Sequence, residues 1–447
     1  MTEKTRSRLL TLLLLFFSLP MFGLLLGRES LYDWDEAWYG QVAKELLRGG
    51  DWLTLHWRGI PFFDKPPLGI WAIALSFRTF GQNEWAARLP SALCSVLTVL
   101  VLFRIGKRIF GKERPALFSA LVLLTTLPFV KAGRMAMLDG PLAFAFTLGI
   151  WTFLEAREKE NSPWGLGLGL SFALVWMIKG PVAILLALTL LAFSLWERNG
   201  KALKSPWILP GLLLVLPWYL AEWSRHGQAF LQSHFGIHML GRAATVLDAH
   251  QGPPWYYLGH IALAGPWFVL FLCALPFLWK KRKETWVRLG VCWAGVVGLA
   301  FSLAATKLPW YVVPAYPGLA LLLGGFLDSF GKKRPYFALT ASYLLLLGLI
   351  GHSLHWEARY APDLRPFSKV QLKQSTGILS LSKTIRPAFI YYLDRPELLT
   401  TPEELPEQWQ KKSAALLSDV EKKTIFLKGA KELKAANGLV LLEKQNP

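Results

Sequence analysis

Carboxylate and ammonium side chains with the capacity for group-transfer chemistry lie close together near the start of the chain. Asp35 and Glu36 follow an apolar segment, and Lys65 stands in a second polar cluster that ends in two prolines. Aromatic residues flank both clusters, and Trp and Tyr favour the boundary between lipid and water. At such a surface a carboxylate can orient or deprotonate a nucleophile, and an ammonium group can neutralise a departing anion. We therefore interpret residues 33–67 as a catalytic loop.

Further single charges occur in otherwise apolar surroundings later in the chain. Charge at membrane depth is costly, so such residues are usually kept for a partner or a task. The alternative for each one is that it marks a helix end and extends to the interface. Because every short outer turn that we predict carries a charge, the set favours a shared anionic ligand. The residues are Arg134, Asp139, Lys179 and Lys307.

The elements that must position these residues are membrane helices. The chain is 53% hydrophobic and 14% aromatic, with a mean hydropathy of +0.34, which is too apolar for an ordinary soluble domain. We predict about eleven helices from runs that approach the roughly 20 residues needed to cross a bilayer. Their predicted limits are 9–26, 86–105, 115–133, 140–154, 164–178, 181–196, 207–223, 255–279, 286–305, 309–327 and 336–355.

The distribution of Lys and Arg predicts the orientation of these helices, because basic connections face the cytoplasm. With the N-terminus inside, the catalytic loop, the single-charge turns and everything after about residue 356 lie on the outer face of the cytoplasmic membrane. This arrangement accounts for the formal charge of +19 without nucleic acid, since no basic stripe interleaved with polar residues is present. The inner connections are those at 104–114, 198–204, 280–283 and 332–334.

The chain is expected to divide into an all-helical membrane domain, residues 1–356, and a small α/β domain outside the membrane, residues 357–447. In the first outer loop, Ala37–Leu47 has the spacing of an amphipathic interfacial helix, and Leu68–Phe80 is apolar but too short to span. In the small domain, short apolar runs predict strands at 388–392, 424–427 and 438–442, and 402–417 is expected to be helical.

Histidines in the second long outer loop raise the question of a metal. His234 and His238 are four residues apart and would share one helix face. Together with His250 and with Asp33, Asp35 and Glu36, they could in principle bind a divalent cation. No metal-binding motif accompanies them. We therefore assign no metal site and favour interfacial histidines, with divalent metal dependence left as the alternative.

The predicted compartment narrows the chemistry. Nucleotide-activated sugars are cytoplasmic, so an enzyme at the outer face must draw its activated group from a lipid carrier such as a polyprenyl phosphate. Cations must then hold the departing phosphate, carboxylates must act on the acceptor, and an apolar groove must take the lipid. The reaction class this suggests is glycosyl transfer. The candidate cations are Lys65, Lys179, Arg242 and Lys307, and the candidate carboxylates are Asp35, Glu36 and Asp139.

An ordered series of motifs resembles bacterial lipid A aminoarabinose transferases and the related protein mannosyltransferases, both membrane-embedded glycosyltransferases of the C type. The series spans most of the first 330 residues. It consists of Asp35-Glu36-Ala37-Trp38-Tyr39, Phe63-Asp64-Lys65-Pro66-Pro67, Glu84-Trp85-Ala86-Ala87-Arg88-Leu89-Pro90-Ser91, Asp139-Gly140-Pro141-Leu142, Lys179-Gly180-Pro181, His238-Met239-Leu240-Gly241-Arg242, Gly252-Pro253-Pro254-Trp255-Tyr256-Tyr257 and Lys307-Leu308-Pro309-Trp310-Tyr311.

The resemblance implies inversion at the anomeric carbon by a single displacement from an undecaprenyl-phosphate-linked sugar. It implies that Asp35 lies near the reacting centre, that Lys65 and Arg242 bind the carrier phosphate, and that Glu36 and Asp139 complete the acidic side. We assign substrate contacts to Tyr39, Arg134 and His238.

One departure from the family pattern leaves the acceptor open. Relatives often carry Arg where this chain has Trp38, which weakens the assignment to aminoarabinose transfer specifically. Lipid A or another envelope glycolipid is the expected acceptor, and Ser or Thr of exported proteins is the alternative. A membrane transporter is the alternative from another class, but its site should lie near the bilayer midplane between repeats, and we detect no repeat.

Overall fold

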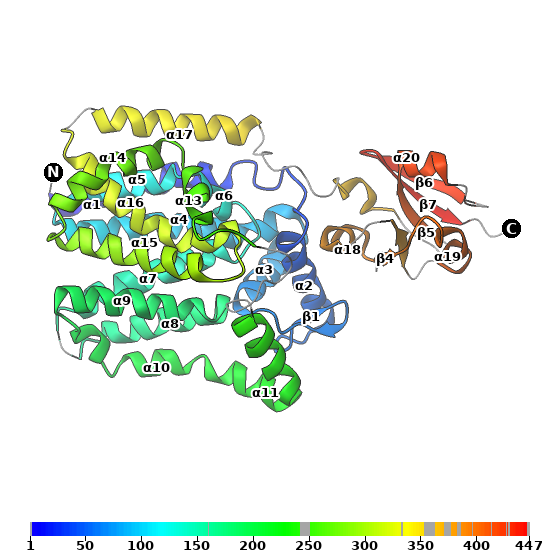
Figure 1. The fold of residues 1–447 in the computed structure, drawn as a ribbon, viewed down its shortest axis with the longest axis horizontal. Coiled ribbons are helices and arrows are strands. Elements are labelled where there is room, and N and C mark those ends of the chain that lie inside the picture. Colours follow the sequence, from blue (N-terminus) through cyan, green and yellow to red (C-terminus); the bar gives the residue numbers. More distant parts are fainter. Residues whose placement is uncertain are drawn as a thin grey trace.

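The computed structural model describes residues 2–159, 161–241, 251–331, 334–352, 363–370, 377–381, 386–395, 397–412, 414–425, 427 and 430–444. Most of the chain forms a bundle of roughly aligned helices, and a smaller part built around a β-sheet lies beyond one end of it (Figure 1). The N-terminus lies at the opposite end of the bundle.

The helices of the bundle follow the apolar segments of the sequence. They are α1 (Glu3–Gly23), α4 (Glu84–Phe110), α5 (Glu113–Leu124), α6 (Leu127–Gly133), α7 (Asp139–Ala156), α8 (Trp164–Lys179), α9 (Val182–Glu197), α10 (Ile208–Leu213), α11 (Leu216–Leu231), the π-helical η2 (Gln232–Gly241), α13 (Tyr256–Ala262), α14 (Pro266–Lys280), α15 (Thr285–Leu303), α16 (Tyr316–Asp328) and α17 (Arg334–His352). Short 3₁₀ helices precede α10 and α16, namely η1 (Lys201–Lys204) and η3 (Pro309–Ala315).

Several of these helices are long and apolar enough to cross a membrane. In the described part of the chain, four do so as single helices, and the number rises to six if each of two bent pairs counts as one span. The pairs are α5 with α6, bent by 66°, and α13 with α14, bent by 111°. Each of the eleven predicted segments overlaps a helix of the described residues, but the count of eleven spans stays a prediction.

The first outer loop folds into two short helices and a small hairpin at the end of the bundle next to the sheet (Figure 1). The two predicted helices are present as α2 (Asp35–Gly49) and α3 (Leu68–Phe80), with the two-residue strands β1 (His56–Trp57) and β2 (Ile60–Pro61) between them. Their position at the membrane interface stays a prediction. Helix α2 ends where Gly50 adopts a φ of 70°, a left-handed conformation that glycine accommodates without strain.

The last part of the chain contains a five-stranded mixed sheet of order β4-β3-β5-β7-β6. Strand β3 runs parallel to β4 and β5, and β7 runs antiparallel to β5 and β6. The strands are β3 (Ile378–Ser380), β4 (Glu397–Leu399), β5 (Ala414–Ser418), β6 (Ala430–Ala436) and β7 (Leu439–Lys444), and the helices are η4 (Arg365–Phe367), α18 (Pro387–Leu393), α19 (Leu405–Lys412) and α20 (Asp419–Thr424). The boundary predicted at 356/357 lies outside the described residues.

Three predictions for this region need correction. Residues 388–392 form helix α18 rather than a strand, because Pro387 fits the first turn of a helix and both faces of the segment are buried. The predicted helix at 402–417 ends at Lys412, and β5 follows it. Thr424 ends α20, so the strand predicted at 424–427 is not formed there, whereas the strand at 438–442 is confirmed as β7.

Helix α18 packs against α2, which joins the last part of the chain to the first outer loop. The backbone N–H of Ala388 donates to Asp33 Oδ1 at 2.9 Å, so Asp33 caps the start of α18. The Tyr392 hydroxyl donates to Glu84 Oε1 at 2.9 Å and accepts from the Leu31 N–H at 2.7 Å. Arg48 forms a two-pronged ion pair with Asp394, with distances of 2.6 and 2.9 Å.

Candidate active site

Asp139 and Lys179 form a buried ion pair at one end of the bundle. Asp139 is the first residue of α7 and Lys179 is the last residue of α8, so the turn between the two antiparallel helices lies at the other end. Their Oδ1 and Nζ atoms are 2.7 Å apart. Lys179 Nζ also lies 5.0 Å from the ring centroid of Tyr311, on η3. The pair therefore joins three elements at one point.

Close packing behind Asp139 fixes the start of α7. Gly140 packs against α4 so tightly that a Cβ there would lie 2.3 Å from Ser91 Oγ. Small residues at helix contacts let the backbones approach in this way. The position of the Asp139 carboxylate is thus set by the contact between α4 and α7.

Asp35 shares the electrostatic environment of this ion pair. It is the first residue of α2 and is half-buried. Burial raises the pKa of Asp35, the ammonium groups of Lys65 and Lys179 act against that rise, and the carboxylates of Asp139 and Asp64 add to it. A carboxylate with a raised pKa next to cations is a common arrangement for a catalytic base.

Lys65 enters the site from the segment between β2 and α3. Its Nζ lies 2.9 Å from Asp64 Oδ1, and its side chain is only 12% exposed. The same carboxylate oxygen lies 2.5 Å from Nδ1 of His238, on η2. Asp64 thus connects Lys65, a predicted phosphate ligand, with His238, a predicted substrate contact.

Glu36 is buried and fully engaged in hydrogen bonds. Its Oε1 accepts from Arg88 Nε at 2.7 Å and from the Ala136 N–H at 2.6 Å. Its Oε2 accepts from Arg88 Nη2 at 2.9 Å and from the Tyr32 N–H at 2.8 Å. Because Ala136 lies in the turn that leads to Asp139, Glu36 ties α2 to that turn. This geometry suits positioning rather than the direct catalytic role predicted for Glu36.

Two further predicted site residues, Lys307 and Arg134, bind backbone carbonyl groups. Lys307 Nζ donates to the carbonyl oxygens of Ser302 and Ala304 at 2.8 and 2.6 Å, so it caps the end of the preceding helix, α15. Arg134 donates to two carbonyl groups at the end of α1. Tyr39 is buried on α2. Arg242 lies outside the described residues.

No metal centre is built by the predicted histidines. His234 Nδ1 lies 2.6 Å from the carbonyl oxygen of Phe63, and its Nε2 lies 3.1 Å from the Tyr219 hydroxyl. Within the part of the chain that the structure describes, no three or more His, Cys, Asp and Glu side chains gather in a way that would hold a metal ion.

Three residues of this arrangement were not predicted: Asp64, Arg88 and Tyr311. Each of them belongs to a motif quoted in the sequence analysis, but no role was assigned to it there. For Arg88 a signal existed, because a charged residue inside an otherwise apolar helix needs a buried counter-ion.

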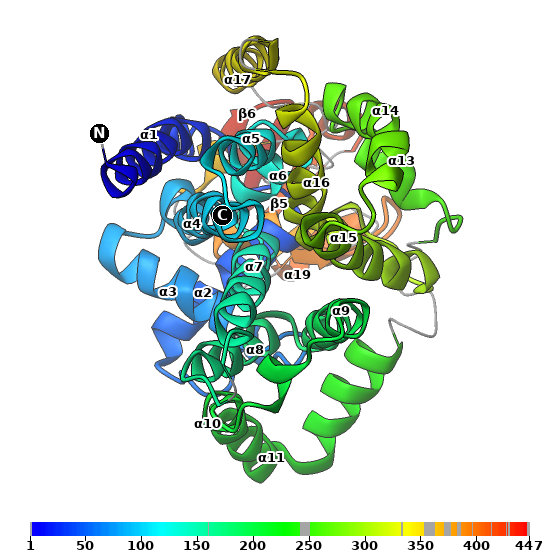
Figure 2. The same cartoon turned by 90° about the vertical axis from the view of Figure 1, so that its left-hand side faces the viewer.

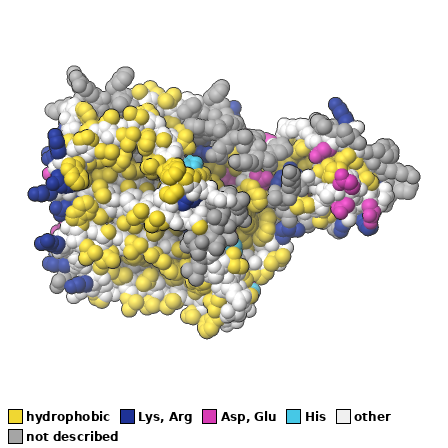
Figure 3. Space-filling model, viewed as in Figure 1, with side chains coloured by type: hydrophobic (Ala, Val, Ile, Leu, Met, Phe, Trp, Pro, Cys, Tyr) yellow, Lys and Arg dark blue, Asp and Glu magenta, His cyan; other side chains and the backbone are white. Residues whose placement is uncertain are grey.

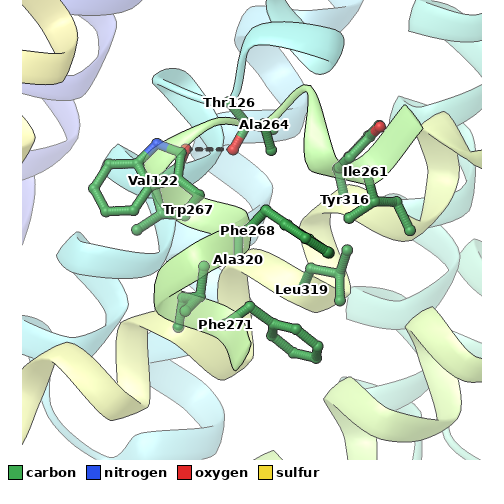
Figure 4. Close-up of a pocket in the computed structure, with 11 residues that line it drawn as sticks. Val122, Thr126, Ile261, Ala264, Trp267, Phe268, Phe271, Tyr316, Leu319 and Ala320 are labelled. Atoms are coloured by element: carbon green, nitrogen blue, oxygen red, sulfur yellow. Dashed lines mark hydrogen bonds between the residues drawn. The ribbon is translucent and has the colours of Figure 1, made fainter. Parts of the chain in front are cut away.

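An apolar cavity lies between α5, α14 and α16 (Figure 4). Its volume is about 310 Å³, part of it open to the surroundings, and its lining includes Trp267, Phe268 and Phe271. The Thr126 hydroxyl donates to the Val122 carbonyl oxygen at 2.7 Å, so the polar group at its edge is satisfied internally. The lining of this cavity is therefore mostly apolar.

Residues 64–223 match the family model described as dolichyl-phosphate-mannose-protein mannosyltransferase. The chain is 32% identical to an undecaprenyl phosphate-alpha-4-amino-4-deoxy-L-arabinose arabinosyl transferase of Pseudomonas paraeruginosa. The alignment extends over 357 residues and covers 78% of this chain and 64% of that protein. The protein of the same name from Edwardsiella ictaluri is 30% identical over 359 residues, covering 77% and 63%. This chain thus spans somewhat less than two thirds of the length of these curated relatives.

The fold resembles that of ArnT from Cupriavidus metallidurans bound to undecaprenyl phosphate, with a TM-score of 0.80 over 96% of this chain and 97% of that chain. The apo state of the same protein gives a TM-score of 0.76. At sequence identities of 19% and 18%, this likeness concerns the fold alone. Taken together, the comparisons show that the chain is similar in sequence to aminoarabinose transferases over more than three quarters of its own length and shares the fold of ArnT.

Proposed function

We propose that this chain is an inverting glycosyltransferase that moves a sugar, most simply 4-amino-4-deoxy-L-arabinose, from undecaprenyl phosphate to lipid A or another envelope glycolipid. The observation that carries the proposal is the buried ion pair of Asp139 with Lys179 at one end of an apolar bundle, whose electrostatic environment Asp35 and Lys65 share. The names of the curated relatives supply the donor chemistry.

The cations of the site act on the departing phosphate. In a single displacement, the acceptor oxygen bonds to the anomeric carbon as the bond from that carbon to the phosphate oxygen breaks, and undecaprenyl phosphate leaves with an added negative charge. Lys65 and Lys179 are placed to stabilise that charge, and Arg242 is assigned to the same task by the family pattern. Asp139 holds Lys179 in position through the ion pair of 2.7 Å.

Asp35 acts on the acceptor. If the acceptor is a hydroxyl, Asp35 accepts its proton, a role that contributes roughly 10²- to 10⁴-fold in rate. If the acceptor is a lipid phosphate, the nucleophile is already anionic and Asp35 orients it. In both cases Glu36 holds the start of α2 against the turn before Asp139, through its hydrogen bonds with the N–H groups of Tyr32 and Ala136.

We place the reaction at the outer face of the bacterial inner membrane, with about eleven spans. Lys and Arg side chains gather at the end of the bundle that holds the N-terminus, and hydrophobic side chains cover its flank (Figure 3). Under the positive-inside rule that end faces the cytoplasm. The site and the small α/β domain then lie outside.

Transfer of mannose to exported proteins is the second candidate. The match of residues 64–223 to the mannosyltransferase family model favours it, as does Trp38 at the position where aminoarabinose transferases often carry Arg. The curated relatives named for arabinosyl transfer favour the first candidate.

Mass spectrometry of the acceptor tests the proposal. The purified chain is incubated with undecaprenyl-phosphate-linked aminoarabinose and lipid A, and we expect one pentosamine to be added. Asp35→Asn should abolish the addition, and Asp51→Asn, a change at a partly exposed carboxylate paired with Arg225, should preserve it. An active Asp35→Asn enzyme would contradict the mechanism, and transfer to a protein acceptor alone would select the second candidate.

A further inference from the structure

A second cavity, separate from the Asp35 cluster, lies where the outer end of α1 meets α6 and the end of α17. Its volume is about 550 Å³, part of it open to the surroundings. Figure 2 shows α1 and α17 on the same side of the bundle, and the Tyr343 hydroxyl of α17 donates to the Phe17 carbonyl oxygen of α1 at 2.9 Å. The cavity therefore sits at a flank of the bundle rather than at its centre.

Basic side chains dominate the polar part of this lining. Arg28, Arg88, Lys131 and Arg134 line it together with one carboxylate, that of Glu29. Arg88 is balanced by its buried pair with Glu36. The remaining lining still carries more positive than negative charge, which suits an anionic ligand.

Arg134 is the residue that most needs explanation. It is 9% exposed, and its Nη1 and Nη2 donate to the carbonyl oxygens of Met21 and Leu24 at 2.9 and 2.7 Å. Among the described residues no carboxylate is paired with it. A buried guanidinium has five N–H donors and remains charged, so two carbonyl contacts leave both charge and donors available at the cavity.

The other part of the lining is apolar and continues onto the flank of the bundle. Leu25, Leu26, Met135 and Ile350 contribute to it. Leu24 and Leu25, at the end of α1, are 45% and 44% exposed. Exposed leucines beside a basic cavity match a ligand that has a charged head and a hydrocarbon tail.

We propose that this cavity binds the phosphate group of an anionic lipid, with the lipid chains lying along α1 and α17. Arg134 and Lys131 bind the phosphate, and Arg28 closes the polar side. The site differs from the donor site, because Lys65 and Lys179 take no part in it. The cavity is connected to the predicted catalytic loop by the ion pair between Arg88, which lines the cavity, and Glu36. Glu36 directly follows Asp35 in the sequence.

Thermal unfolding of the full chain in detergent, titrated with dioleoyl phosphatidic acid, tests the proposal without requiring transfer activity. We expect a saturable rise in Tm for the unchanged protein and for Lys65→Ala. Arg134→Gln and Lys131→Gln should each weaken the apparent affinity by about tenfold, because each removes a charge-assisted contact to phosphate. Lys201→Gln, at the basic end of the bundle, is the control and should titrate like the unchanged protein.

Two comparisons define the ligand and protect the test against misfolding. Inorganic phosphate and dioleoyl phosphatidylcholine should give no saturable shift; an equal shift with either would overturn the assignment to an anionic lipid. Arg134→Gln could lower Tm in the absence of lipid, because Arg134 contacts the end of α1. In that case the lipid affinities of Lys131→Gln and Arg28→Gln decide whether the cavity binds lipid, since neither change removes those contacts. Unaltered affinity in both of those variants would overturn the proposal.

Discussion

Replacing Glu36 by Gln separates a positioning role from a catalytic one. The carboxylate accepts four hydrogen bonds, two of them from Arg88, and both side chains are buried. The Gln amide can accept at one end only, so its NH₂ group must face N–H donors at the other. The change also leaves the Arg88 guanidinium buried without its counter-ion.

The expected magnitude follows from that loss. Breaking a buried ion pair by removing one partner costs about 3–5 kcal/mol, mostly because the other charge stays buried. We therefore expect Glu36→Gln to lower Tm substantially and to lose transfer activity together with the fold. Thermal unfolding in detergent and the lipid A assay, performed on the same preparation, measure both effects.

The double variant Glu36→Leu with Arg88→Met provides the control. It removes both charges and keeps the site filled, so stability should recover relative to either single change. A Glu36→Gln protein with unchanged Tm but no transfer would refute the positioning argument and restore Glu36 to a direct catalytic role.

The remaining predictions concern three other residues. Burial raises the pKa of Asp35, so if it acts as a base, kcat/KM should fall as the pH is lowered through a value above the ordinary Asp range; a profile without that limb would exclude the role. Lys65→Ala should lose the thermal stabilisation produced by undecaprenyl phosphate, which Lys201→Gln should keep; equal stabilisation in both would remove Lys65 from the phosphate site. Burial lowers the pKa of Lys44 to about 8, so the unfolded chain binds more protons there and stability should rise between about pH 8 and 10. Lys44→Met should reduce that rise in unfolding experiments, and an unchanged slope would contradict the shift.

The sequence was sufficient to predict the bundle because apolar runs of spanning length have few other uses. The breaks inside those apolar runs were not predicted from the sequence. A hydropathy window does not register Gly265, whose φ of 61° separates α13 from α14, or the turn at Thr125 between α5 and α6.

One contact of the candidate site follows from the positions of helix ends alone. The first residue of α7 and the last residue of α8 meet because an antiparallel helix pair brings them to the same end, so Asp139 and Lys179 could be paired from the sequence. Glu36 and Arg88 could not be paired in this way, since their contact depends on how the outer loop folds back onto α4. Helix α18 was mistaken for a strand because five apolar residues fit either period, and its docking on α2 decided the outcome.

The cap that Asp33 provides for α18 links residues 355 positions apart. At a synthesis rate of about 5–20 residues per second, the segment that steadies the start of α2 emerges roughly 20 to 70 s after Asp33 itself. During that interval the bundle helices can enter the bilayer while Asp35 still lacks its final support. The start of α2 thus gains this contact only after α18 has been synthesised, and a nascent chain that stops before Ala388 would hold the bundle helices without it.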